Sequence, residues 1–192
     1  MEKKYLEMTR GVILMKLMLI LTKNGLFSFC LKMLKPTHIL TNKQKIFLLA
    51  FSNSQLIKSF TFSGGTALCG FYIPYRYSED LDFFSVQEFE TQDIVTWVKS
   101  IQKFLGFHTY DIQTVFNRNL IFLNFQDDIL KTEFTFYPFL PYKTEKYLDI
   151  SVDSLEDIAV NKLFTLYQKP RLRDYMDLYM ICLAEKYQLN DL

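Results

Sequence analysis

The sequence is poor in the residues on which several classes of enzyme depend. It contains three cysteines in 192 residues, spaced far apart, which fits reduced thiols in a cytosolic protein better than a disulfide framework or a zinc site. Its two histidines, His38 and His108, have no serine or cysteine near them in a recognisable nucleophile motif. We therefore do not expect a serine or cysteine hydrolase, and acid–base or metal chemistry must come from carboxylates and lysine.

The sequence also lacks an apolar run long enough to cross a membrane. Its most apolar stretch, residues 11–21, is interrupted by Lys16, and Lys23 closes it, whereas a spanning helix needs about 20 apolar residues. No small-residue cleavage site of a signal peptide follows. We expect an ordinary buried helix here, in a cytoplasmic protein with no membrane partner.

Neither sign of charge is in excess. The 22 basic and 21 acidic residues leave a formal net charge of +1, with histidine neutral. The overall field therefore supplies no general attraction to nucleic acid, and an RNA partner would have to bind a local basic patch.

Hydrophobic and aromatic residues are abundant, at 49% and 17% of the chain, which favours one well-packed core. Apolar spacing and break residues predict helices over 5–23, 25–34 and 42–51. A strand, turn, helix and second strand are predicted over 59–84, with the second strand resuming near Tyr77. A helix over 92–105, capped by Thr91 and stopped by Gly106, follows.

An alternating pattern then predicts an antiparallel meander over 107–116, 120–125 and 129–137, with turns at 117–119 and 126–128. Pro138 and Pro141 are expected to end the sheet. The remainder is predicted to be helical, with one helix over 154–168 and another beginning near Arg171.

Together these elements predict an α+β fold, a mixed or antiparallel sheet flanked by helices, with helices at both ends of the chain. We divide it into an N-terminal helical segment (1–52), an α/β core (53–141) and a C-terminal helical segment (142–192). We expect these to form one compact unit.

The glycine pair Gly64-Gly65 is the most informative local feature. It stands between a short apolar strand and Thr66, where a helix is predicted to begin. Glycine lets the backbone turn sharply and approach a ligand, and a helix N-terminus offers unpaired N–H groups. This pattern predicts a turn that holds phosphate.

Asp80 and Asp82 follow at a spacing of two on the next predicted strand, so both project from one face while Leu81 and Phe83 point into the core. Two such carboxylates form a hard-oxygen site suited to Mg²⁺. The alternative is a pair of acids that only face water. Ser78 would share their face and could bond a phosphate oxygen, or it could cap the local turn.

Glu133 lies in the middle of the last meander strand, on the face shared with Lys131 and Thr135. Polymerase-type nucleotidyl transfer clamps two metal ions between two or three carboxylates, and Glu133 is a natural third. The alternative is a solvated glutamate paired with Lys131.

Lys162 stands where the apolar stripe of its helix calls for a hydrophobic residue. It must reach solvent, pair, or meet an anionic ligand, because an unpaired buried charge is costly. Pairing with Asp174 or Asp177 would make it purely structural. An Arg173–Asp177 pair at i,i+4 would contribute only about 0.3–0.5 kcal/mol if exposed, so a common ligand for these charges is the functional alternative.

Three separated blocks of the chain now resemble one family. Residues 63–68 (SGGTAL), 76–83 (RYSEDLDF) and 157–179, with DIAVNK and RDYMDLY, are similar to the AbiEii/AbiGii toxin family of nucleotidyltransferases. The similarity covers about residues 35–185. That family resembles DNA polymerase β and other minimal nucleotidyltransferases in fold. It includes toxins of toxin–antitoxin and abortive-infection systems, among them MenT-type enzymes that add nucleotides to tRNA.

The resemblance implies metal ligation by Asp80 and Asp82, with Glu133 fitting the third position. It implies a catalytic or nucleotide-binding role for Lys162 and places Asp174 in the distal functional motif. The residues expected to contact the nucleotide or its phosphates are Gly64, Gly65, Thr66, Arg76, Ser78, Lys162, Arg173 and Asp177.

The sequence thus predicts a Mg²⁺-dependent (or Mn²⁺-dependent) nucleotidyltransferase that moves a nucleotide from an NTP to an RNA hydroxyl, with tRNA the leading acceptor by resemblance. A cognate antitoxin would be its partner. Two alternatives stay open. One is a non-catalytic nucleotide-binding or regulatory module, and the other is a nucleotidyltransferase acting on a small molecule or a protein.

Overall fold

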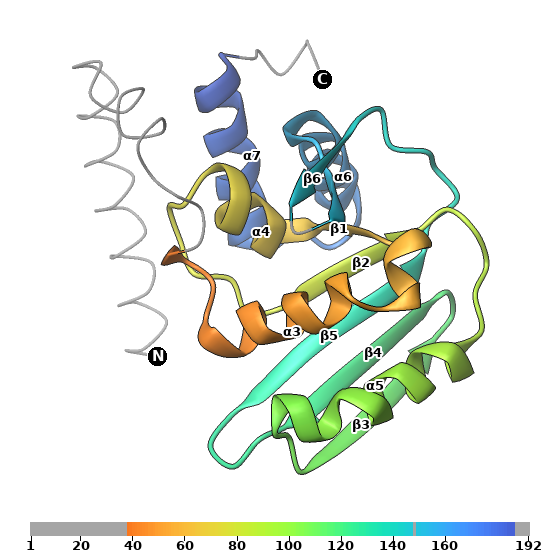
Figure 1. The fold of residues 1–192 in the computed structure, drawn as a ribbon. Coiled ribbons are helices and arrows are strands. Elements are labelled where there is room, and N and C mark those ends of the chain that lie inside the picture. Colours follow the sequence, from red (N-terminus) through yellow and green to blue (C-terminus); the bar gives the residue numbers. More distant parts are fainter. Residues whose placement is uncertain (1–37, 148, 187–192) are drawn as a thin grey trace. The chain divides into compact units, whose positions relative to one another are not determined.

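A seven-stranded mixed sheet organises the part of the chain that the computed structural model describes, residues 38–147 and 149–186 (Figure 1). The strand order is β3-β4-β5-β2-β1-β7-β6. The strands are β1 (Thr61–Ser63), β2 (Leu81–Ser85), β3 (Thr109–Val115), β4 (Arg118–Asn124), β5 (Ile129–Phe136), β6 (Thr144–Tyr147) and β7 (Ile150–Asp153). The predicted α+β class is confirmed.

Helices connect and cover these strands. They are α3 (Asn42–Ser52), the 3₁₀ turn η2 (Gln55–Lys58), α4 (Gly64–Ala67), the π-helical turn η3 (Leu68–Tyr72), α5 (Thr91–Leu105), α6 (Leu155–Gln168) and α7 (Leu172–Glu185). No helix among the described residues is both long and apolar enough to span a membrane. The helices predicted over 5–23 and 25–34, and the apolar stretch 11–21, lie outside the described residues.

Aromatic side chains fill the core between α3, α5 and the sheet. Phe83 of β2 stacks on Phe134 of β5 with ring centroids 5.0 Å apart, and Phe51 of α3 lies 4.4 Å from Phe83. Trp97 of α5 meets Phe47 edge to face. These phenylalanine rings are fully buried, and burying each side chain contributes about 1.5–3 kcal/mol.

The centre of the sheet sets the register of the acidic residues. β2 pairs antiparallel with β1, which places Ser63 opposite Asp82, and parallel with β5, which places Glu133 opposite Asp82. Neighbouring strands lie about 4.8 Å apart. Ser63, Asp82 and Glu133 therefore form one row on the face of the sheet opposite the aromatic core.

The sheet continues beyond the prolines that were expected to end it. After Pro138 and Pro141, β6 and β7 form an antiparallel hairpin, and β7 pairs parallel with β1. Ile150 and Val152 of β7 are fully buried. The prediction of a purely helical remainder was wrong because each strand has only four residues, too few to establish a period.

The N-terminal ends of two elements also differ from the prediction. Strand β2, which follows the glycine turn and its helix, begins at Leu81 rather than near Tyr77. The carbonyls of Ser78 and Glu79 accept hydrogen bonds from Gln44 Nε2 instead of pairing in the sheet. Glu90, not Thr91, is the N-cap of α5, and the Thr91 hydroxyl donates to Asn119 instead.

The turn between the first two meander strands lies earlier than expected. It falls at Phe116–Asn117, where Phe116 adopts a positive φ of 56°, so that Arg118 and Asn119 already belong to β4. The helices 42–51, 92–105 and 154–168, the Gly106 stop and the antiparallel meander are confirmed. The domain limits at 52 and 141 stay predictions.

Candidate active site

Neighbouring side chains lie so close to the backbone of the Gly64-Gly65 turn that no larger residue would fit there. Gly64 has φ +75°, and a Cβ there would lie 2.1 Å from Asp82 Oδ2. A Cβ on Gly65 would lie 2.5 Å from Arg76 Nη2 and 3.1 Å from Ser78 Oγ. The structure thus brings the glycine turn, Arg76, Ser78 and Asp82 together, as the sequence predicted.

Thr66 and Gln44 hold the segment that leads from the turn to the acids. The buried Thr66 hydroxyl donates to the Asp80 carbonyl, so it serves the backbone rather than an open site. Gln44 is buried as well, and Thr41 completes a capping box with it at the start of α3. Gln44 was missed from the sequence, and a buried glutamine in the first turn of an apolar helix is the signal that could have found it.

Asp80, Asp82 and Glu133 repel one another at the centre of the site. Partial burial, followed by the charges of Glu133 and Asp80, raises the pKa of Asp82 to about 7. The charges of Lys131 and Lys162 oppose this shift. A cation stabilises the charged form of a carboxylate that lies among other carboxylates. Without a cation, the charged form of Asp82 is unfavourable.

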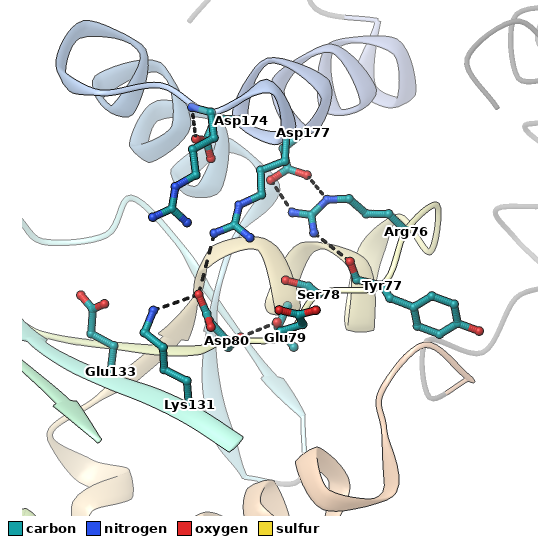
Figure 2. Close-up of polar contacts among 12 residues, drawn as sticks. Arg76, Tyr77, Ser78, Glu79, Asp80, Lys131, Glu133, Asp174 and Asp177 are labelled. Carbon is teal, nitrogen blue, oxygen red and sulfur yellow. Dashed lines mark hydrogen bonds and ion pairs between the residues drawn. The ribbon is translucent and has the colours of Figure 1, made fainter. Parts of the chain in front are cut away.

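Basic side chains neutralise the two neighbours of Asp82, and Figure 2 shows the one that Lys131 contributes at Asp80. Lys131 Nζ lies 3.0 Å from Asp80 Oδ2, and Arg173 Nη2 lies 3.8 Å from the same oxygen. Arg118 binds Glu133 with both prongs of its guanidinium, at 2.6 and 2.7 Å. Glu133 is only 6% exposed, so the alternative of a solvated glutamate paired with Lys131 is wrong.

Lys162 of α6 reaches two carboxylates of α7. Its Nζ lies 2.8 Å from Asp174 Oδ1 and 2.7 Å from Asp177 Oδ2. Asp174 also accepts from the backbone N–H of Arg171 and so caps α7. Burial alone would raise the pKa of Asp174, but the hydrogen bonds from Lys162 and Arg171 lower it. These contacts are those of the structural alternative for Lys162, and its role toward a nucleotide stays a prediction.

Asp177 of α7 binds the segment between η3 and β2, which follows the glycine turn. Arg76 donates to both of its oxygens at 2.8 Å, and the Tyr75 hydroxyl also donates to it. Burial opposes the charge of this carboxylate, yet the hydrogen bond from Arg76 and the charges of Lys162 and Arg76 lower its pKa. Asp177 therefore pairs with Arg76 and Lys162. It does not pair with Arg173, which the i,i+4 spacing had suggested as its partner.

The oxygen donors of the site suit a hard metal ion, although they are not already arranged around one. Within residues 38–147 and 149–186, no group of three or more acidic, histidine or cysteine side chains is already arranged to hold one. The residues nonetheless fit a hard cation. Burial and two acidic neighbours raise the pKa of Asp82, and those neighbours, Asp80 and Glu133, each already bind a positive side chain.

The structure gathers the predicted residues into two adjoining clusters. Gly64, Gly65, Ser78, Asp80, Asp82 and Glu133 lie on or beside the central strands, while Lys162, Asp174 and Asp177 lie on the C-terminal helices. Arg76 and Arg173 connect the two. Sequence reasoning missed Arg118 and did not assign Lys131 to Asp80, because both pairings depend on strand register.

Comparison with known proteins identifies relatives of this arrangement. A family model described as the nucleotidyl transferase AbiEii toxin of type IV toxin–antitoxin systems matches residues 46–191. JHP933 from Helicobacter pylori is similar in structure, with a TM-score of 0.60, 21% identity, and coverage of 78% of this chain and 69% of that one. A second Helicobacter pylori protein, solved as a candidate nucleotidyltransferase, has a TM-score of 0.59 and 23% identity, over 78% and 71% of the two chains. None of the curated proteins compared with the chain matches it.

Proposed function

Because the chain belongs to the AbiEii family of nucleotidyl transferase toxins of type IV toxin–antitoxin systems, we propose that it transfers a nucleotide from an NTP to an RNA hydroxyl. By the resemblance of its motifs, tRNA is the leading acceptor. The similar solved structures share the predicted nucleotidyltransferase fold. The observation that carries the proposal is Asp82, which lies directly beside the glycine turn and whose pKa is raised by burial and by the charges of Glu133 and Asp80.

Asp80, Asp82 and Glu133 are the residues that would hold Mg²⁺ or Mn²⁺. When bound, such ions neutralise the triphosphate and lower the pKa of the attacking hydroxyl. Lys131 and Arg118 support this assignment, because they already place positive charge against Asp80 and Glu133. Once a metal ion takes over that role, both side chains become available to phosphate oxygens.

The glycine turn would hold the leaving phosphates. Gly64 and Gly65 let a ligand approach the backbone, with Arg76 Nη2 and Ser78 Oγ beside Gly65. An acceptor oxygen then attacks the α-phosphate, the bond between the α- and β-phosphates breaks, and pyrophosphate leaves. Lys162 and Arg76 are positioned by Asp177 on the side of the turn, and we assign them to the phosphate charge.

A transfer assay tests the proposal. The full chain is incubated with each of the four labelled NTPs, Mg²⁺ and total RNA, and the labelled species are separated. We expect label on RNA, in the tRNA size range. Label on protein or on a small molecule would support the other nucleotidyltransferase alternative, and nucleotide binding without transfer would support the non-catalytic one.

Two matched substitutions connect the assay to the site. Asp82→Asn should reduce transfer at least 100-fold, because it removes a metal ligand that no neighbour replaces. Asp127→Asn makes the same chemical change in an exposed turn between β4 and β5 and should leave transfer unchanged. Transfer by Asp82→Asn at the parent rate would overturn the assignment of the site.

A further inference from the structure

The two edges of the sheet differ in their protection against pairing with another chain. The strand order places β3 at one edge and β6 at the other, and Figure 1 shows β3 beneath α5 with no further strand of the described residues beyond it. A sheet edge presents unpaired N–H and C=O groups that another strand can bind. Proteins prevent this pairing with short edge strands, charged side chains, proline or a bulge.

Strand β6 has two of these protecting features. It contains only four residues, and two of them are Glu145 and Lys146. The exposed Lys143 directly precedes it. A strand laid along β6 would find few backbone groups to bind and would draw charged side chains away from water, so this edge is blocked.

Strand β3 has none of these features. Its seven residues, TYDIQTV, include no lysine or proline, and Asp111 carries its only charge. Its pairing with β4 runs without a bulge from Thr109, opposite Asn124, to Val115, opposite Arg118. Among the described residues, β4 is the only strand that pairs with it. Strand β3 therefore offers a long, regular and weakly charged edge.

The hydrogen bonds of the meander show which groups of β3 face outward. The N–H of Phe136 donates to the carbonyl of Asn117, just before β4, so the odd-numbered residues of β4 bond to β5. Its even-numbered residues then bond to β3, where they lie opposite odd-numbered residues. The N–H and C=O groups of the even-numbered residues of β3 are left pointing away from the sheet. These residues are Tyr110, Ile112 and Thr114.

We propose that β3 pairs with β3 of a second copy of this chain, antiparallel about a two-fold axis at Ile112. In this register Ile112 faces Ile112 of the second copy, and Tyr110 faces Thr114. All three residues have outward backbone groups, so each facing pair exchanges both of its N–H···O bonds. Ile112 is half-buried on its own sheet, and the isoleucine of the second copy would cover its remaining surface.

The single charge of β3 favours this antiparallel register. Residues that flank the two-fold axis face each other, so Asp111 lies opposite Gln113 of the second copy. The amide of glutamine can donate to the carboxylate. A parallel, in-register pair would instead place two copies of Asp111 side by side, and like charges that face each other across a strand pair are destabilising.

The difference between the two edges also sets the size of the assembly. Pairing of β3 with β3 uses the only unprotected edge of each copy, so the association closes at two chains. A two-fold axis perpendicular to the sheet keeps Asp82 of both copies on one face, seven strand spacings or about 34 Å apart. The pairing therefore covers neither candidate active site, and it does not depend on the proposed function.

Sedimentation of the full chain tests the proposal. We expect a dimer of twice the 22.9 kDa of one chain, with a dimer fraction that rises between about 1 and 200 µM. Thr114→Pro should raise the dissociation constant at least tenfold, because proline removes an outward N–H and its ring crowds the second copy. The bonds between β3 and β4 do not use this N–H. The exposed Thr114 hydroxyl loses only its bond to Asn119.

The matched control makes the same substitution at the opposite edge. The N–H of Ser154 donates to the carbonyl of Lys143, so by the same alternation the N–H of the exposed Thr144 points outward from β6. Thr144→Pro should leave the dissociation constant unchanged. Circular dichroism of both variants checks that they fold.

Engineered disulfides test the register and do not depend on proline. In Ile112→Cys the two new cysteines face each other with Cα atoms about 5.5 Å apart, within the range of a disulfide. In Thr114→Cys they lie about 14 Å apart along the strands, too far to be joined. We expect peptide mapping after mild oxidation to find the intermolecular disulfide at position 112 and none at position 114.

A parent chain that stays monomeric over the whole concentration range would overturn the proposal. So would a dimer that Thr114→Pro and Thr144→Pro leave equally stable, since it would form through another surface. Disulfides of similar yield at positions 112 and 114 would reject the antiparallel register.

Discussion

At the scale of single residues, Asp82 carries the largest unfavourable electrostatic cost described above. Its pKa is raised to about 7, from the usual 3.8 of an aspartate, because burial and two acidic neighbours disfavour its charged form. Between these two values the folded state binds a proton that the unfolded state has lost. Folding stability associated with this residue is therefore present at low pH and is lost as pH rises toward about 7.

Replacing Asp82 by asparagine should consequently stabilise the metal-free protein. In EDTA, we expect the Tm of Asp82→Asn to exceed that of the parent at about pH 8, and the difference to shrink toward about pH 5. Thermal unfolding followed by circular dichroism at the two pH values measures it. A variant that melts below the parent at about pH 8 would show that Asp82 is not under electrostatic strain.

Single residues also show what sequence can and cannot predict. The glycine turn, Asp80 and Asp82 could be predicted because their relationship is local: Asp80 directly precedes β2 and Asp82 is its second residue. The partner of Glu133 was not readable. Arg118 reaches it only because β4 and β5 pair in a particular register, and Lys131 reaches Asp80 across 51 residues of sequence.

At the scale of elements, the contact between α7 and the glycine unit is a buried charge network. Asp177 is fully buried and accepts from Arg76, Tyr75 and Lys162. Removing one member of such a network leaves the others buried and unpaired, which costs about 3–5 kcal/mol. An exposed ion pair has no such cost.

The network can be tested by comparing two aspartates in urea unfolding. Asp177→Ala should lower the free energy of unfolding by about 3–5 kcal/mol, since Arg76 loses its carboxylate. Asp128→Ala breaks the exposed pair with Lys43, whose atoms lie 3.1 Å apart, and should cost less than about 1 kcal/mol. Equal effects of the two substitutions would contradict the network.

Elements of regular period were predicted well and short ones were not. Helices α5 and α6 and the meander β3–β5 repeat their apolar spacing often enough to be recognised. β6 and β7 were missed, although Ile150 and Val152 alternate with Ser151 and Asp153. β7 depends on pairing with β1, some 90 residues earlier, and β6 pairs only with β7, so no local pattern contains the pairing that makes them strands.

At the scale of the whole molecule, divalent cations should couple to both stability and pH. An ion that binds only the folded protein stabilises it by an amount that grows with the logarithm of the ratio of ion concentration to Kd, and protonation of Asp82 competes with binding. Mg²⁺ or Mn²⁺ should therefore raise the Tm of the parent more at about pH 8 than at about pH 6, and should not raise that of Asp82→Asn.

Calorimetric titration with Mn²⁺ at the same two pH values measures the coupling directly. Asp127→Asn, in its exposed turn, serves as the control and should behave as the parent. A cation effect of equal size in Asp82→Asn would place the ion elsewhere in the molecule.

The order of the strands has a consequence for synthesis. β7 pairs with β1 inside the sheet, and Asp177 anchors Arg76 beside the glycine turn, yet β7 and Asp177 follow β1 by some 90 residues or more. A chain still emerging from the ribosome cannot complete this arrangement until those late segments are free to fold back. We therefore expect nascent chains that have not yet exposed α7 to lack the Arg76–Asp177 contact beside the glycine turn.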